Sequence, residues 1–235
     1  MSLSKMEQNS TLQMTINQAW VTSALADSDV PKALTLCFSL KRTLTSRKVV
    51  VIVSQKLSPS MKEVLHLGFD QLFYLDEDWN TANLKCEEFV KVFTLTLKSF
   101  EKLVFLEPAM LVMKNSDEIF AEFGKDSTSD CELQPFLWVE NGDNSVFGVR
   151  PCHPVFKTLM KGLMSKNGMI VEKYLRNWSK NQVEKCQFLD AKHNRLMSPQ
   201  TGTLLGFENE VSIIKMASGC MKRKTGKFGI LEQVG

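Results

Sequence analysis

The sequence lacks the short motifs by which several enzyme classes are recognised. It contains no G-x-G-x-x-G, P-loop, G-x-S-x-G or H-E-x-x-H pattern, so the usual motifs of dinucleotide binding, P-loop nucleotide binding, serine hydrolysis and zinc-dependent proteolysis are absent. Histidine is scarce as well, with 3 residues in the chain of 235, and none has a partner close in sequence. No local arrangement therefore predicts a nucleophile, a general base or a zinc site.

Long apolar runs and paired cysteines are also missing. No window approaches the roughly 18 apolar residues of a membrane span, and residues 1–14 lack the apolar core of a secretory signal. The 6 cysteines include no C-x-x-C pair, so we expect reduced, buried thiols rather than zinc or redox chemistry. We expect an intracellular protein, cytoplasmic or nuclear, without a membrane partner.

The charge is nearly balanced, with a formal net charge of +3, and does not by itself indicate a polyanionic partner. Basic residues gather near the C-terminal end at Lys222, Arg223 and Lys224. Aromatic side chains, which nucleic-acid-binding segments usually interleave with cations, are represented nearby only by Phe228. We expect a solvated tail here, and nucleic-acid binding is a less favoured alternative.

The composition is that of a globular domain, with 43% apolar and 23% charged residues. We see no internal repeat and no linker between domains. The expected organisation is a flexible N-terminal tail over 1–14, one domain over 15–220 and a basic C-terminal tail over 221–235.

The first half of the chain alternates between strand and helix patterns. We expect strands at 18–25, 48–54, 71–76 and 101–107, and helices at 28–42, 58–69 and 84–100. This alternation predicts an α/β fold with a mostly parallel central sheet flanked by helices. Sites in such sheets lie at the carboxyl ends of strands, which directs attention to Leu25, Asp29, Ser54, Asp76 and Glu107.

The pattern weakens after Glu107. We expect a short strand at 111–113, a helix at 115–123, two strands at 134–140 and 144–150, and a helix at 154–164. The two later strands flank an Asn-Gly pair typical of a hairpin turn.

Four segments carry a resemblance to a known family. They read AWVTSALADSDVPKALTLCFSLKR, VVVIVSQKLSPSMKEVL, FDQLFYLD and KLVFLEPAMLVMKNSDEIF. Together they resemble glycogenin and its relatives in glycosyltransferase family 8, over roughly residues 18–123. The resemblance implies the GT-A fold, a single Rossmann-related nucleotide-binding domain, with UDP-glucose as donor and Mn²⁺ as cofactor.

The metal-binding triplet of that family, D-x-D, aligns with Glu107-Pro108-Ala109. Two aspartates suit a hard divalent cation that neutralises the diphosphate leaving group. Here one longer carboxylate remains, and a methyl group replaces the other. We therefore expect that Mn²⁺ and UDP-glucose binding are lost and that no residue of the chain ligates a metal.

Other donor-site positions of the family also differ. In the donor loop Thr22 remains, whereas Leu25 and Asp29 replace a polar residue and the tyrosine that stacks on uracil. Lys91 matches the family lysine that contacts the donor. The sugar-binding motif F-N-S-G-V-F aligns with 142–147, which includes Asp143 and Asn144, and the metal-binding histidine aligns with Lys215.

These differences lead to three hypotheses of function. The first is a catalytically inactive pseudo-glycosyltransferase that is not an enzyme and acts as a protein-interaction or scaffold module, as a homodimer or with another protein. The second is a metal-independent glycosyltransferase using a UDP-sugar, in which the Lys215 ammonium replaces part of the metal charge, Lys91 assists, and Glu107 positions donor hydroxyls. The third is nucleic-acid binding through the basic tail. If Lys215 has no catalytic role, we expect it to form a structural salt bridge with Glu107.

Overall fold

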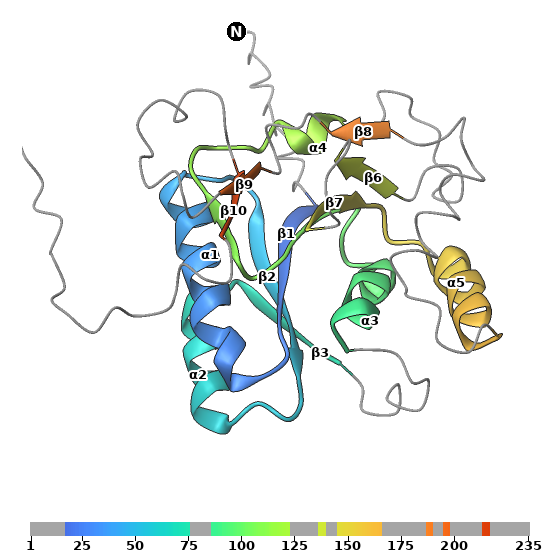
Figure 1. Ribbon diagram of the computed structural model, residues 1–235, viewed down its shortest axis with the longest axis horizontal. Helices are drawn as coiled ribbons and strands as arrows, with labels where there is room; N and C mark the ends of the chain where they lie inside the picture. The colour runs from blue at the N-terminus through green and yellow to red at the C-terminus, as the bar shows by residue number, and fades with distance from the viewer. Residues whose placement is uncertain are drawn as a thin grey trace, which may run out of the picture.

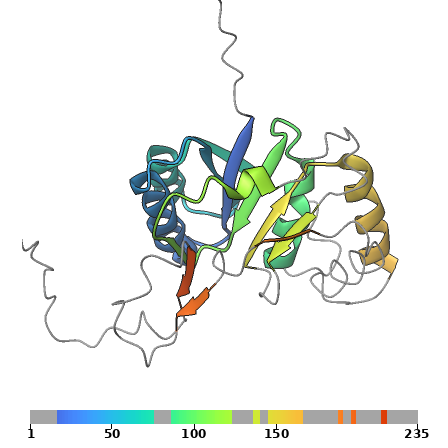
Figure 2. The ribbon, with the colours of Figure 1, turned by 90° about the horizontal axis from the view of Figure 1, so that it is seen from above.

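The computed structural model describes residues 17–75, 86–122, 136–139, 145–165, 187–189, 195–197 and 213–216. Within these ranges a twisted sheet lies between two layers of helices (Figure 1; Figure 2). This arrangement confirms the predicted α/β fold class. Among the described helices, none is long and apolar enough to cross a bilayer.

The main sheet has the strand order β3-β2-β1-β4-β7-β6-β8. Its strands are β1 (Gln18–Ala24), β2 (Lys48–Ser54), β3 (Gln71–Leu75), β4 (Lys102–Leu106), β6 (Phe136–Val139), β7 (Val146–Val149) and β8 (Gln187–Leu189). Strands β3, β2, β1 and β4 are mutually parallel, and β7 runs antiparallel to both β4 and β6. A smaller sheet joins β5 (Met110–Val112), β10 (Ile213–Met216) and β9 (Arg195–Met197).

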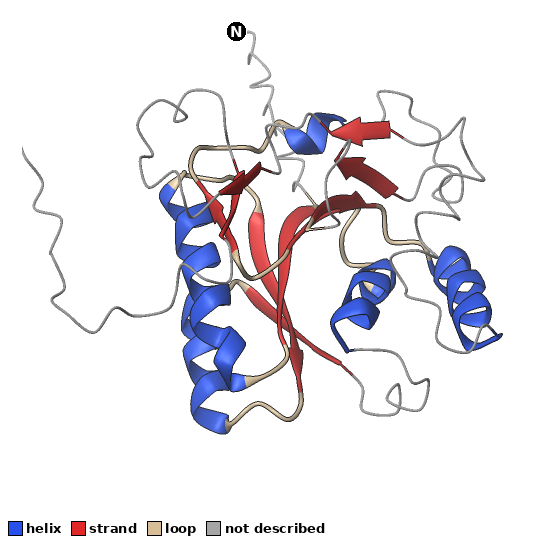
Figure 3. Cartoon of the chain, viewed as in Figure 1, coloured by secondary structure: helices blue, strands red, loops and turns tan. Residues whose placement is uncertain are grey.

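The helices divide between the two faces of the sheet (Figure 3). On one face lie α1 (Val30–Arg42) and α2 (Pro59–Gly68), and on the other lie α3 (Cys86–Phe93) and α5 (His153–Ser165). A short helix, α4 (Ile119–Glu122), and two 3₁₀ turns, Asp27–Asp29 and Thr94–Thr96, complete the described elements.

Two apolar cores follow from the alternation of side chains along the strands. In β1, Trp20 and Ala24 pack toward α1 and α2, whereas Ala19 and Val21 pack toward α3 and α5. Strand β2 is apolar on both faces because it lies inside the parallel part of the sheet. The core therefore holds β1, β2 and β4 rigidly, and their carboxyl ends form one edge.

A cluster around Asp117 links the loop after α1 to the segment after β5. Asp117 Oδ1 accepts hydrogen bonds from Thr45 Oγ1 at 2.6 Å and from Trp20 Nε1 at 3.2 Å. Its Oδ2 accepts from the Ser46 amide at 2.8 Å and from Ser46 Oγ at 3.0 Å. Partial burial alone would raise the pKa of this carboxyl, but these four hydrogen bonds outweigh it and lower the pKa from its ordinary value. The cluster lies near the amino end of the parallel strands.

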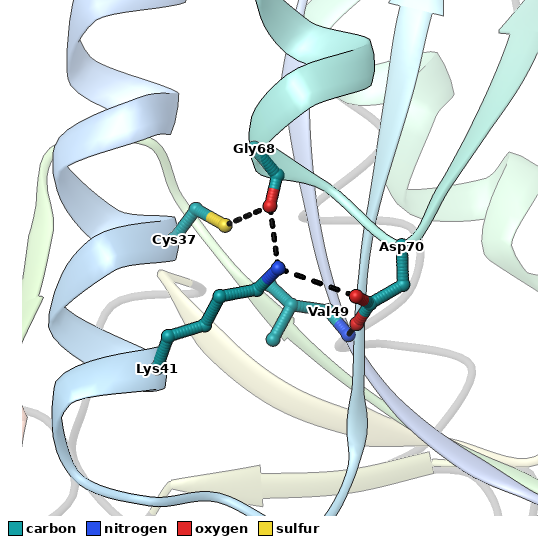
Figure 4. Close-up of polar contacts among 5 residues, drawn as sticks. All are labelled: Cys37, Lys41, Val49, Gly68 and Asp70. Atoms are coloured by element: carbon teal, nitrogen blue, oxygen red, sulfur yellow. Dashed lines mark hydrogen bonds and ion pairs between the residues drawn. The ribbon is translucent and has the colours of Figure 1, made fainter.

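A second polar cluster joins α1, α2 and β2 (Figure 4). The Gly68 carbonyl, at the end of α2, accepts from Lys41 Nζ at 2.6 Å and from the Cys37 thiol at 3.3 Å. Lys41 also pairs with Asp70, whose other carboxylate oxygen accepts the Val49 amide at 2.7 Å. These bonds satisfy a carbonyl that the helix itself leaves without a partner.

The sequence-based elements are correct in type but less accurate in length. The helix predicted at 84–100 ends at Phe93, because the Thr94 and Thr96 hydroxyls bond the carbonyls of Lys91 and Phe93 and favour a 3₁₀ turn. The helix predicted at 115–123 is reduced to α4. Strands β8, β9 and β10 were not predicted.

The expectation of reduced thiols holds at Cys37 and is wrong at Cys152. Cys37 is free and buried, whereas Cys152 is disulfide-bonded.

Candidate functional site

The candidate site lies where β4 ends. Glu107 follows β4 directly, and the β4–β7 register pairs Leu106 with Val146. This register places Ser145, one residue before β7, beside Glu107, and the Glu107 amide donates to the Ser145 carbonyl at 2.9 Å. The antiparallel pairing thus fixes the backbone on both sides of the carboxylate.

Both oxygens of the Glu107 carboxylate have partners within the protein. Oε1 lies 3.1 Å from Lys91 Nζ, and Oε2 accepts a hydrogen bond from Ser145 Oγ at 2.9 Å. The Lys91 side chain is 5% exposed and the Glu107 side chain 28% exposed, while Ser145 is fully buried. A largely desolvated ion pair therefore stands at this edge of the sheet. We call these three residues the Lys91–Glu107–Ser145 cluster.

Helix α3 carries Lys91 to this position. The neighbouring residues Phe89, Val90 and Val92 are buried in the core on the α3 face. Leu25 packs against the same core, and Ser145 lies two residues before Phe147 of that core, on the same face of the sheet. Apolar anchoring of the helix thus brings a lysine to a carboxylate 16 positions away in sequence.

A turn follows Glu107. The Met110 amide donates to the Glu107 carbonyl at 3.1 Å, with Pro108 and Ala109 as the central residues. Proline suits the first central position of such a turn because its φ is already fixed and its missing N–H is not required. Met110 is 1% exposed and anchors the end of the turn, whereas Ala109 is partly exposed.

The loop after β1 is organised by its own carboxylates. Asp29 Oδ2 accepts the Ala26 amide at 3.2 Å and the Leu25 amide at 3.4 Å. Asp27 Oδ1 accepts the Ser58 amide at 3.0 Å, which ties this loop to the start of α2. Asp29, which the resemblance aligned with an aromatic residue, thus shapes the backbone of the loop.

Thr22 does not join the Lys91–Glu107–Ser145 cluster. By strand alternation its side chain shares the face of β1 that carries Trp20 and Ala24, opposite the face with α3. It is 2% exposed, and its hydroxyl has no hydrogen-bond partner in the described structure.

Several predicted site residues lie outside the described residues: Asp76, Asp143, Asn144, Lys222, Arg223 and Lys224. Lys215 belongs to β10, where its backbone lies opposite Met110 of β5 and Leu196 of β9; its side chain is outside the described part. The predicted Lys215–Glu107 salt bridge therefore stays a prediction, and the described cation at Glu107 is Lys91. Ser145 was missed as a site residue, although the Asn144-Ser145 pair of the aligned motif contained the signal.

The described residues at Glu107 do not fit a Mn²⁺ site. A divalent ion needs several oxygen ligands, but both Glu107 oxygens are engaged and Ala109 offers none. Across the described ranges, no group of three or more His, Cys, Asp or Glu side chains is placed to hold a metal.

The fold is that of the GT-A glycosyltransferases. GlyE of Streptococcus pneumoniae TIGR4 aligns with a TM-score of 0.63 and 13% identity over 91% of this chain and 57% of that chain. The galactosyltransferase LgtC aligns with a TM-score of 0.58 and 9% identity over 84% of this chain and 86% of that chain. At such identities the likeness shows the fold alone.

In sequence the chain is similar to the glycogenins. Human glycogenin-2 is 28% identical over 184 residues, covering 72% of this chain and 36% of the relative, and Caenorhabditis elegans glycogenin-1 is 27% identical over 154 residues, covering 62% and 35%. The matched part thus spans about a third of these curated relatives. No protein-family model matches the chain.

These comparisons correct one prediction. The expectation that the chain is not an enzyme is wrong, because its relatives are glycogenins and its structural neighbours are glycosyltransferases. The changes at Glu107 and Ala109 are differences in sequence and do not demonstrate a loss of activity.

Proposed function

We propose that this chain is a glycosyltransferase domain that uses a sugar nucleotide as donor, with the donor diphosphate bound beside the Lys91–Glu107–Ser145 cluster. The observation that carries the proposal is the convergence of three segments. Lys91, Glu107 and the 142–147 motif were each assigned to the donor site from the resemblance alone, and Lys91, Glu107 and Ser145 of that motif are within hydrogen-bonding distance in sequence-distant elements. The glycosyltransferase fold and the similarity to glycogenins support the same function.

The chemistry of such a transfer explains what the cluster would do. Cleavage of the sugar–phosphate bond leaves negative charge on the departing diphosphate, and a fixed cation lowers the energy of that charge. The Lys91 ammonium is held by Glu107 and largely removed from water. An ammonium in this environment interacts with an anion more strongly than one in bulk solvent. Ser145 holds the second oxygen of Glu107 and so fixes the carboxylate that positions the lysine.

The experiment is a calorimetric titration of the folded protein with UDP and UDP-glucose in the presence of Mn²⁺, followed by an assay for release of UDP from UDP-glucose. We expect binding by the wild type and a loss of about 10- to 150-fold in affinity for Lys91→Met, which corresponds to one charge-assisted contact of about 1.5 to 3 kcal/mol. Lys98→Met is the matched control, because Lys98 is an exposed lysine in the segment that follows α3. Absence of binding by folded wild type would contradict the proposal.

A role in protein interaction is a second candidate and is compatible with the first. Large apolar side chains are exposed on the neighbouring helices α1 and α2: Phe38 is 60%, Val64 41% and Leu67 84% exposed. Such side chains favour a protein partner, either a second copy of this chain or a different protein. Sedimentation of the wild type and of Phe38→Ser/Leu67→Ser tests the first arrangement. A wild type that is monomeric at all concentrations would exclude self-association through this surface.

A further inference from the structure

We infer that this chain handles the donor diphosphate without a divalent metal ion, and that the Lys91 ammonium, held by Glu107, supplies the positive charge there. The inference rests on the proposed function, since it assumes a nucleotide-sugar donor. It goes further in naming the cation and in predicting how binding responds to metal.

The first step is the engagement of the carboxylate. A metal ion at Glu107 would compete with Lys91 for Oε1 and with Ser145 for Oε2. Displacing Lys91 would leave an ammonium that is 5% exposed without the carboxylate that now pairs with it. Breaking an ion pair that is largely removed from water is unfavourable. The protein itself therefore opposes metal binding at this carboxylate.

The second step is the geometry of the turn after Glu107. The Met110 amide closes the turn onto the Glu107 carbonyl, and buried Met110 fixes its end. Ala109 aligns with the second aspartate of the metal-binding D-x-D triplet, and its methyl group offers no ligand oxygen there. Lys215, which the resemblance aligns with a metal-binding histidine, has its backbone opposite Met110 across the β5–β10 pair.

The third step is the balance of charge. Two aspartates without a metal would repel a diphosphate. Among the described residues this site keeps one carboxylate, Glu107, and the Lys91 ammonium lies 3.1 Å from it, so the pair carries no net negative charge. Replacement of the second carboxylate by Ala109 removes one negative charge from the place where the diphosphate would lie. With alanine at position 109, the described part of the site repels a diphosphate less than two aspartates would.

The test compares UDP binding by the wild-type chain in excess EDTA and in saturating Mn²⁺. We expect dissociation constants that agree within about twofold. Affinity that rises by more than about tenfold with Mn²⁺ would overturn this inference and leave the proposed function standing. No binding in either condition would overturn the proposed function, and with it the role of Lys91 toward a diphosphate.

A second measurement reads the metal directly and requires no turnover. Electron paramagnetic resonance of free Mn²⁺, with and without UDP, is compared between the wild type and Glu107→Gln. We expect the two proteins to remove equal amounts of Mn²⁺ from solution. Mn²⁺ bound by the wild type and not by Glu107→Gln would show that Glu107 is a metal ligand and would overturn the inference.

Discussion

The Asp117 cluster allows one stability prediction to be worked out in detail. Asp117→Asn preserves the shape of the side chain but removes its charge. Its Oδ1 would still accept from Thr45 and Trp20, whereas the new amide group would face the Ser46 amide, which is also a donor. The substitution thus weakens two hydrogen bonds, breaks the one from the Ser46 amide, and reverses the one with the Ser46 hydroxyl, whose oxygen can accept from the new amide group.

The magnitude follows from the type of bond. Hydrogen bonds to charged groups contribute about 1.5 to 3 kcal/mol each and neutral ones about 0.5 to 1.5 kcal/mol. Weakening the bonds from Thr45 and Trp20 costs about 1 kcal/mol each, and the solvent exposure of Ser46 makes the lost bond from its amide contribute little. We expect Asp117→Asn to lower the free energy of unfolding by about 2 kcal/mol at pH 7.

The assay is urea denaturation followed by tryptophan fluorescence and circular dichroism. Glu118→Gln is the matched control, because the same chemical change is made at an exposed neighbouring residue. Because the folded pKa of Asp117 lies below its ordinary value of 3.8, its contribution is present above that pH and is lost as the pH falls through the folded pKa. The gap between wild type and Asp117→Asn should therefore narrow below about pH 4. An equal effect of both substitutions, or a gap that does not change with pH, would refute this account.

Two further predictions concern single side chains. Leu44 has φ 57°, in the left-handed region that favours glycine, and is 84% exposed; Leu44→Gly should stabilise the fold by about 0.5 to 1 kcal/mol, and a lower urea midpoint would contradict this. Burial raises the pKa of the Cys37 thiol to about 11, although Lys41 acts in the opposite direction. At pH 8 this thiol should therefore react with a thiol reagent only as the protein unfolds. Peptide mass spectrometry after timed labelling checks this, and labelling as fast as that of free glutathione would disprove it.

The first half of the fold could be predicted from the sequence because its signals are local. Strand β2 is apolar on both faces and starts and ends as predicted. Pro31 and Pro59 mark the first turns of α1 and α2, where a missing N–H costs nothing. Signals of this kind require no knowledge of tertiary contacts.

The end of α3 could not be predicted in the same way. Residues 94–100 continue a helical apolar pattern, but Leu95 and Phe100 contribute to the core from a 3₁₀ turn and the segment after it. The threonine hydroxyls that bond the preceding carbonyls compete with the helix there. Tertiary packing overrides a local pattern in this case.

The contact between Lys91 and Glu107 was not predicted from the sequence. The resemblance aligned both residues with donor-site positions, and the partner expected for Glu107 was Lys215, whose side chain lies outside the described part. Pairing depends on how far α3 advances along the sheet and on the β4–β7 register that brings Ser145 to the carboxylate. Neither the position of α3 along the sheet nor the β4–β7 register can be read from a short stretch of sequence.

The two polar clusters, at Asp117 and at Gly68, lie toward the edge of the sheet where its parallel strands begin, whereas Glu107 stands at the edge where β4 ends. Residues that stabilise the fold are therefore separated from residues that would contact a ligand. Substitution of acids, lysines and small side chains at the carboxyl ends of the strands can alter what the protein binds without disturbing the two polar clusters. A fold divided in this way can change its chemistry over evolutionary time without first having to become unstable.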